Sequence, residues 1–240
     1  MALKSAVDVD VLVAPDELRQ AAELLEARGY RLLIPDSPRA LESWHRVRKE
    51  SVWLQSKSGV QIDLHTRFAD NRTMIPGIGI RSAVRRVDVG NGVHLPTLNA
   101  ADNFAYLAVH GASSAWFRLK WISDFAALVA WTSAEQLDQL YRRSLDLGAG
   151  RAPAQALLLA DRLFGTLERN APLRGRLLGD PANLRLYRAA LKQLAGRTEP
   201  VEPTSRPLGT LRIHWTQFLL IPGARFKALE LLRQIRSTLS

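Results

Sequence analysis

The chain has 240 residues, 47% of them hydrophobic, and a formal net charge of +10. This length and apolar content suffice for a real core in one large domain or two small ones. The lack of cysteine excludes disulfides and thiolate metal sites, and no run reaches the roughly 18 apolar residues of a membrane-spanning helix. We therefore expect a soluble, cytoplasmic protein without an integral membrane segment.

The positive charge is concentrated in the last third of the chain. Residues 1–150 contain 18 Lys and Arg against 17 Asp and Glu, whereas residues 151–240 contain 15 against 6. Such a surface attracts polyanions, nucleic acid first and anionic membrane second. The alternative is that arginine-rich helices are simply solvated, and the segment lacks the interleaved aromatic and basic residues of a base-stacking surface.

The N-terminal segment alternates apolar and acidic residues. Every second residue of 7–13 is valine, with Asp8 and Asp10 between them, which predicts a half-buried strand with one apolar and one acidic face. The stretch "PDELRQAAELLEARGY" (15–30) predicts a helix, and "YRLLIP" (30–35) predicts a second strand. The chain is thus expected to begin as a β-α-β unit.

Two β-hairpins are expected next. The segments 50–56 and 60–68 flank the turn "KSG", and the second hairpin, 85–98, turns at Gly90-Asn91-Gly92. In the second arm of the first hairpin the two faces again differ. The face predicted to be apolar carries Val60, Ile62 and Leu64, and the polar face carries Gln61, Asp63 and His65.

From Asn99 onward the spacing of apolar residues becomes helical. Asn99 with Asp102 and Ser133 with Gln136 have the spacing of helix N-caps. The helices are expected at 99–112, 115–131, 133–148, 152–164, 181–195 and at the end of the chain, with a proline-rich linker at 196–207. The predicted fold class is α+β: a small α/β domain over 1–96, a mixed sheet with flanking helices, followed by an all-α helical domain over 97–240.

The last helix admits two readings. Leu229, Leu232, Ile235 and Leu239 share one side of it, with basic residues nearby. This stripe is expected to dock on the protein's own domain; contact with an anionic membrane is the alternative.

The acidic residues of the two strands form the main chemical signal. Alternate strand residues lie about 6.5–7 Å apart on one face, so Asp8 and Asp10 repel unless a cation or a proton intervenes. Mg²⁺ suits such a pair, because it takes oxygen ligands and completes its shell with water and phosphates. If the hairpin strand pairs beside the first strand, Asp63 supplies a third acid. The alternative is the solvated face of an ordinary sheet.

These residues carry a resemblance to a known family. "DVDVLV…ELRQAAELLEARGY", "VQIDLHTRF" and "YLAVHGASSAWFRLKWISDFAALV" are similar to a poorly characterised bacterial group within the polymerase-β type nucleotidyltransferase superfamily. The resemblance is strongest at 7–30, 60–68 and 104–130. It implies a nucleotidyltransferase-like fold and Mg²⁺-dependent transfer of a nucleoside monophosphate from an NTP, expected to be ATP, to a hydroxyl acceptor that the sequence does not identify.

The resemblance also implies roles for individual residues. Asp8, Asp10 and Asp63 would bind Mg²⁺, and Asp63 would help to deprotonate the acceptor. Four further residues would line a nucleotide-binding cleft between the domains: His110, Arg118, Lys120 and Asp124. Considered without the resemblance, His110 also fits a core histidine, and His65 fits a residue that orients Asp63, one that contacts phosphate, or a histidine on the surface of an edge strand.

One element of the superfamily pattern is not found. The superfamily holds the triphosphate with a Gly-Ser turn on a helix before the first acidic strand, whereas only seven residues precede Asp8 here and none is glycine. The sequence is therefore expected either to lack an N-terminal segment or to have lost transfer activity. In the second case it would be a binding module of nucleotidyltransferase fold whose basic last third engages nucleic acid or an acidic partner.

Overall fold

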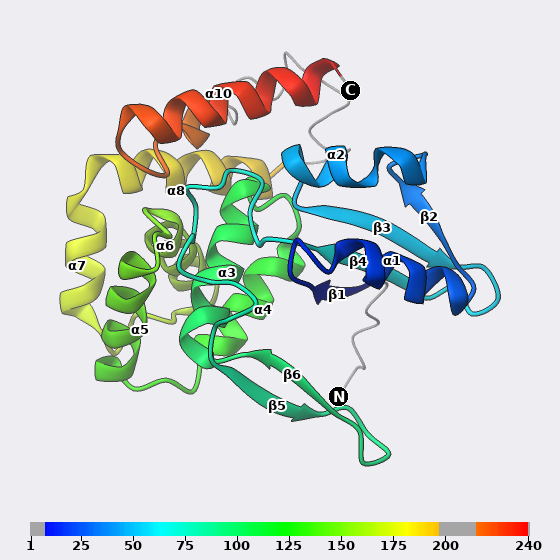
Figure 1. Ribbon diagram of the computed structural model, residues 1–240. Coiled ribbons are helices and arrows are strands. Elements are labelled where there is room, and N and C mark those ends of the chain that lie inside the picture. Colours follow the sequence, from blue (N-terminus) through cyan, green and yellow to red (C-terminus); the bar gives the residue numbers. More distant parts are fainter. Residues whose placement is uncertain (1–7, 197–214, 240) are drawn as a thin grey trace. The chain divides into compact units, whose positions relative to one another are not determined.

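The computed structural model describes residues 8–196 and 215–239 (Figure 1). By its internal contacts the chain forms two compact units. The first comprises the residues up to Asp70 with Gly79–Arg81, and the second comprises Asn71–Ile78 and the residues from Ser82 onward. The division predicted at residue 96 stays a prediction, and Val7 and all but the first residue of the predicted linker lie outside the described residues.

The first unit contains a four-stranded mixed sheet of order β1-β4-β3-β2. Its strands are β1 (Asp8–Leu12), β2 (Tyr30–Ile34), β3 (Glu50–Gln55) and β4 (Gln61–His65). β1 runs parallel to β4, whereas β3 is antiparallel to both β4 and β2. β3 and β4 thus form the predicted hairpin, and β1 lies beside β4, the pairing on which the carboxylate argument depends.

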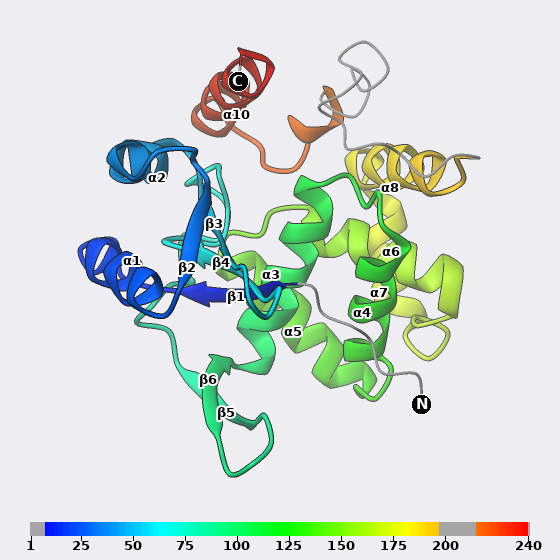
Figure 2. The same cartoon turned by 90° about the vertical axis from the view of Figure 1, so that its right-hand side faces the viewer.

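One face of this sheet is covered by two helices, α1 (Leu18–Ala27) and α2 (Leu41–Val47), which lie on the same side of it (Figure 2). We call this the covered face. Its core consists of Leu18, Ala22, Leu41, Trp53 and Leu64. α1 forms because its apolar residues recur at helical spacing, although it is shorter than the predicted 15–30. α2 and the 3₁₀ turn η1 (Pro38–Ala40) before it were not predicted, because seven residues are too few to show a helical period.

The strand β1 lies at the edge of the sheet and is less buried than the valine alternation predicted. Val9 is 48% exposed and Val11 37% exposed, while Val13, just after the strand, packs against the core of the covered face. The expectation of a half-buried β1 is therefore wrong. The physical reason is that α1 contacts β2 and α2 contacts β3, so that the core of the covered face reaches the edge strand only at Val13.

The second unit contains a two-stranded hairpin, β5 (Val84–Asp88) and β6 (His94–Leu98). The predicted turn at Gly90-Asn91-Gly92 is present. All three residues have positive φ, at 98°, 54° and 73°, a region that glycine and asparagine tolerate better than other residues.

The remainder of the second unit is helical. Its helices are α3 (Ala100–Ser113), α4 (Leu119–Val129), α5 (Ala134–Asp146), α6 (Ala152–Phe164), α7 (Ala171–Gly179), α8 (Pro181–Leu194) and α10 (Ala224–Leu239). α6 is central: it packs against α3, α4, α5, α7 and α8, and each of its residues from Ala152 to Ala160 is buried. The N-caps predicted at Asn99 and Ser133 are confirmed, the latter as a complete capping box, whereas α7 was not predicted.

The face by which α10 docks differs from the predicted one. Phe226 and Glu230 are each 2% exposed, whereas Leu232 and Ile235 of the predicted stripe are 47% and 46% exposed. Glu230 accepts hydrogen bonds from Asn71, Arg233 and Gln234. Burial alone would raise the pKa of Glu230, but these hydrogen bonds and the charge of Arg233 outweigh it and lower the pKa. A paired acid thus occupies the buried side, which an apolar pattern does not reveal.

Among the described residues, none of the helices combines the length and apolarity that crossing a bilayer requires.

Candidate active site

The face of the β1–β4 sheet opposite the covered face carries most of the predicted chemistry. We call it the acidic face. It is formed by alternate residues of β1, β4 and β3, which share one side of the sheet because strand side chains alternate. Its polar members are Asp8, Asp10, Glu50, Gln61, Asp63 and His65.

Asp10 and Asp63 are direct neighbours across two strands. The parallel register of β1 and β4 places Asp10 opposite Asp63 and Asp8 opposite Gln61, and neighbouring strands lie about 4.8 Å apart. The alternation in the sequence predicted three acids on matching faces of two strands. The register brings Asp10 and Asp63 side by side, and Asp8 lies two residues before Asp10 on the same face of β1.

The environment of Asp63 makes its ionisation costly. Burial, above all, raises the pKa of Asp63, and the negative charges of Glu50, Asp10 and Asp8 raise it further; the hydrogen bond from Gln61 acts in the opposite direction. Gln61 Nε2 donates to Asp63 Oδ1 at 2.9 Å, and Oδ2 accepts no hydrogen bond from a described residue. A nearby cation would relieve this repulsion, since an opposite charge favours the ionised form.

His65 is buried at the end of the same face, only 2% exposed, between two carboxylates. Its Nε2 lies 3.2 Å from Asp10 Oδ1 and 3.2 Å from Glu50 Oε2. The reading of His65 as a surface histidine is therefore wrong, because β1 and β3 flank it on both sides. Its hydrogen-bond partner is Asp10 rather than Asp63.

Glu50 is a member of the site that the sequence analysis missed. It begins β3 opposite His65 and forms an ion pair with Lys49. Only the register of the β3–β4 hairpin reveals this neighbour, and the spacing of Glu50 from the three aspartates in the sequence gives no signal of it.

The acidic face offers oxygen ligands but no preformed cage. In the described part of the chain, no group of three or more His, Asp and Glu side chains is arranged to hold a metal ion. The donors that do lie together, the carboxylates of Asp10 and Asp63, have the hard-oxygen chemistry that Mg²⁺ prefers.

The four residues of the second unit predicted to bind nucleotide lie on two packed helices, α3 and α4. His110 is in the last turn of α3, Arg118 is the N-cap residue of α4, and Lys120 and Asp124 are within α4. Arg118 and Lys120 are exposed, and His110 and Asp124 are half-buried. Their role in nucleotide binding stays a prediction.

Aromatic rings surround two of these residues. The His110 and Trp121 rings meet edge to face with centroids 4.9 Å apart, and the Arg118 guanidinium lies 5.7 Å from the centre of the Trp121 ring and 5.3 Å from that of Phe117. His110 is therefore half-buried and in contact with an aromatic ring. Arg118 is exposed and makes cation–π contacts with two aromatic rings.

Comparison with known families identifies the class of protein. A family model described as "Uncharacterised nucleotidyltransferase" matches residues 1–165, which include the sheet with the acidic face and the helices α3 to α6. The chain belongs to this uncharacterised nucleotidyltransferase family, as its resemblance predicted. No curated protein and no solved structure matches it.

Proposed function

We propose that the protein is a Mg²⁺-dependent nucleotidyltransferase that transfers a nucleoside monophosphate from an NTP to an acceptor hydroxyl. The NTP that we expect is ATP. The observation that carries the proposal is the register that sets Asp10 opposite Asp63 on the acidic face, in a chain of nucleotidyltransferase family.

The donor set fits the metal. Mg²⁺ is usually bound by one or two carboxylates together with substrate phosphates rather than by a complete protein cage. Asp10 and Asp63 would provide these carboxylates, and Asp8, on the same face, would add charge or a further ligand. When bound, the metal would supply Lewis-acid stabilisation of the charge on the phosphates.

The chain's own residues would orient the reactants and accept the proton. The acceptor oxygen bonds to the α-phosphorus, the bond from that phosphorus to the oxygen bridging to the β-phosphate breaks, and pyrophosphate leaves. The hydroxyl proton passes to the carboxylate of Asp63, whose position Gln61 fixes through its hydrogen bond. By the resemblance, contacts to the nucleotide are proposed for His110, Arg118, Lys120 and Asp124.

A labelling experiment tests the reaction class. The full chain is incubated with Mg²⁺ and with ATP labelled at either the α- or the γ-phosphate, in the presence of fractionated metabolites, RNA and protein as acceptors. Nucleotidyl transfer moves the α-label onto an acceptor and releases the γ-label as pyrophosphate. Transfer of the γ-label instead would show phosphoryl transfer and contradict the proposal.

Matched variants locate the site. Asp10→Asn and Asp63→Asn should each lower Mg·ATP binding in a calorimetric titration at least tenfold, because each removes a proposed ligand. Asp16→Asn removes an exposed acid just before α1 and should bind like the wild type. Equal binding by all four proteins would remove the acidic face from the proposal.

A second candidate function, a nucleic-acid binding module, is favoured by one observation. Arg185, Arg188 and Lys192 are exposed at spacings of three and four residues along α8, and so lie on one side of the helix. Among the described residues, these three side chains have no ion-pair or hydrogen-bond partner, and a row of such cations suits a phosphate backbone. We call these three residues the α8 basic row.

The salt dependence of RNA binding distinguishes specific contacts by the α8 basic row from attraction by the net positive charge alone. Replacing the α8 basic row with glutamine should lower the slope of log affinity against log salt for single-stranded RNA by about 2, since each phosphate contact contributes about 0.7. The matched control replaces Arg142, Arg174 and Arg176, which already pair with acids, and should change the slope less. Equal changes in both variants would show that net charge alone drives binding.

A further inference from the structure

We infer that His65 is a positioning residue that fixes the carboxylate of Asp10, and that Glu50, which lies against the same Nε2, helps to hold the imidazole in place. This inference rests on the proposed function, since it concerns how a proposed metal ligand is oriented. It assigns roles to two residues, one on β4 and one on β3, that lie outside the three predicted aspartates.

The contacts of His65 determine which ring nitrogen donates. Its Nε2 lies 3.2 Å from Asp10 Oδ1 and 3.2 Å from Glu50 Oε2, and a carboxylate oxygen only accepts hydrogen bonds. Nε2 must therefore carry a proton, which it donates to Asp10 Oδ1, while the Glu50 carboxylate lies beside the same nitrogen as a negative charge. The register supports the arrangement independently, because β4 places His65 between Leu12 of β1 and Glu50 of β3.

The two ends of the Asp10–His65 contact differ in exposure. The side chain of Asp10 is 52% exposed on an edge strand, whereas that of His65 is 2% exposed. An exposed carboxylate samples several rotamers, and a donor from a buried ring restricts its rotation. Partners of this kind orient the carboxylates and imidazoles that bind metals in many proteins.

A purely structural role explains the environment of His65 less well. Its Nδ1 is buried and has no hydrogen-bond partner among the described residues, and burying a polar atom without a partner costs free energy. An apolar side chain would avoid that cost. The polar end that does have partners, Nε2, faces only carboxylates of the acidic face.

The comparison with His45 supports the same conclusion. His45 is also buried in this unit, but its ring nitrogens lie 3.0 Å from the hydroxyls of Thr66 and Ser51. Its partners are therefore neutral hydroxyl groups rather than carboxylates. His45 provides a matched control in the same sheet.

The test measures Mn²⁺ binding by electron paramagnetic resonance on the full chain without nucleotide, together with the midpoint of unfolding in metal-free buffer. His65→Leu removes the donor at similar volume, His65→Gln keeps an N–H donor, and His45→Leu is the control. We expect about a tenfold to hundredfold weaker Mn²⁺ binding in His65→Leu and binding within about threefold of wild type in His65→Gln. His45→Leu should lower the unfolding midpoint and leave Mn²⁺ binding unchanged.

The outcomes separate the two claims. If the wild type binds Mn²⁺ and His65→Leu binds it equally well, the positioning role is wrong while the proposed metal site stands. If His65→Gln and His65→Leu weaken binding equally, the donor is not the operative feature, and the inference is again overturned. If the wild type and Asp10→Asn show the same negligible binding, the metal part of the proposed function fails and the role of His65 fails with it.

Discussion

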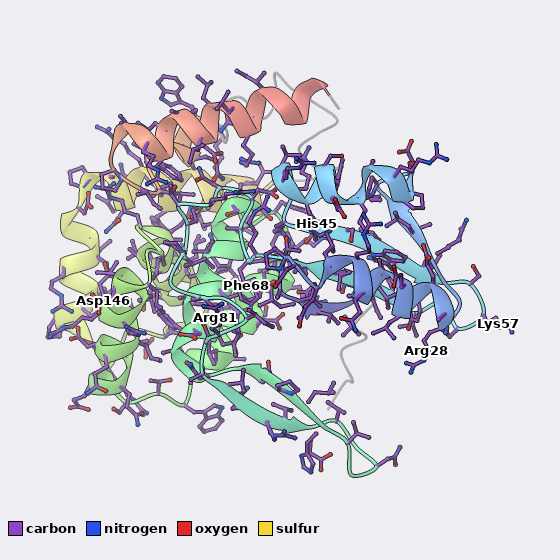
Figure 3. The ribbon with its side chains drawn as sticks, viewed as in Figure 1. Arg28, His45, Lys57, Phe68, Arg81 and Asp146 are labelled. Atoms are coloured by element: carbon purple, nitrogen blue, oxygen red, sulfur yellow. The ribbon has the colours of Figure 1, made fainter. Side chains whose placement is uncertain are left out.

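The covered face and the acidic face of the β1–β4 sheet each contain one buried histidine, with different partners. On the covered face, His45 of α2 lies between the sheet and its own helix (Figure 3) and contacts two hydroxyls. Burial, followed by the positive charges of Arg67 and His65, lowers the pKa of His45 to about 4. The covered face therefore keeps this ring neutral and uses it as part of a packed core.

On the acidic face, His65 contacts two carboxylates, and neighbouring acids raise the pKa of Asp63. Like charges close together reduce stability, so this face gives up stability where the covered face gains it. The difference teaches that burial alone does not identify a functional histidine. The chemistry of its partners does, and it separates a side of the sheet built for stability from a side suited to binding.

The largest expected difference between the faces is in packing. Trp53 and Val52 are consecutive in β3, but Trp53 is fully buried on the covered face and Val52 is partly buried on the acidic face. Trp53→Ala should destabilise the first unit by about 3–5 kcal/mol, and Val52→Ala by about 1 kcal/mol. Hydrogen exchange of peptides covering residues 50–65 measures the loss within this unit. Similar losses in the two variants would contradict the assignment of the faces.

The acids of the site could be predicted from the sequence because strand alternation is a local pattern. Asp8, Asp10 and Asp63 each lie between two apolar residues of a predicted strand. Because strand side chains alternate, all three are predicted on the face opposite the apolar residues. Glu50 could not be predicted, because its proximity to His65 depends on the register of the hairpin and not on its sequence neighbours. Exposure of β1 was mispredicted for a similar reason: alternation shows which residues share a face but not how far the covering helices extend.

In the helical part, too, local patterns could be predicted from the sequence and long-range contacts could not. The N-caps at Asn99 and Ser133 are local hydrogen-bond patterns and were predicted correctly. The docking face of α10 depends on Asn71, which lies far away in the sequence and hydrogen-bonds Glu230. A stripe of leucines indicates an amphipathic helix, yet a buried acid with three polar partners decides which side faces the protein.

The next largest effect concerns the pH dependence of the covered face. Unfolded His45 binds a proton near pH 6.5, whereas the folded protein resists protonation down to a pKa of about 4. Stability should therefore be complete above pH 6.5, decrease as the pH falls from 6.5 towards 4, and level off below. One pKa unit corresponds to about 1.4 kcal/mol, so the loss amounts to about 3 kcal/mol at most.

Urea titrations of the wild type and His45→Gln across this pH range isolate the effect. The glutamine variant keeps a polar side chain that does not titrate, so its stability should change less between pH 6.5 and 4, and the difference between the two proteins is the contribution of His45. Parallel pH profiles would mean that His45 is not held neutral in the folded state and that the two faces differ less than their contacts indicate.

The smallest effect is expected on the acidic face and has the opposite sign. In metal-free protein at neutral pH, Asp63→Asn removes the repulsion between two acids in direct cross-strand register and should raise the unfolding free energy by about 0.2–1 kcal/mol. The pKa of Asp63 is raised in the folded state, so the folded protein binds this proton more readily than the unfolded chain. The gain should therefore vanish as the pH falls through the titration of Asp63. It should also shrink at 1 M salt, where charges are screened within about 3 Å. Asp16→Asn changes an exposed acid that is not among the charges raising the pKa of Asp63, and it should show neither dependence. A destabilised Asp63→Asn protein would mean that this carboxylate supports the fold and that the charges of the acidic face do not strain it.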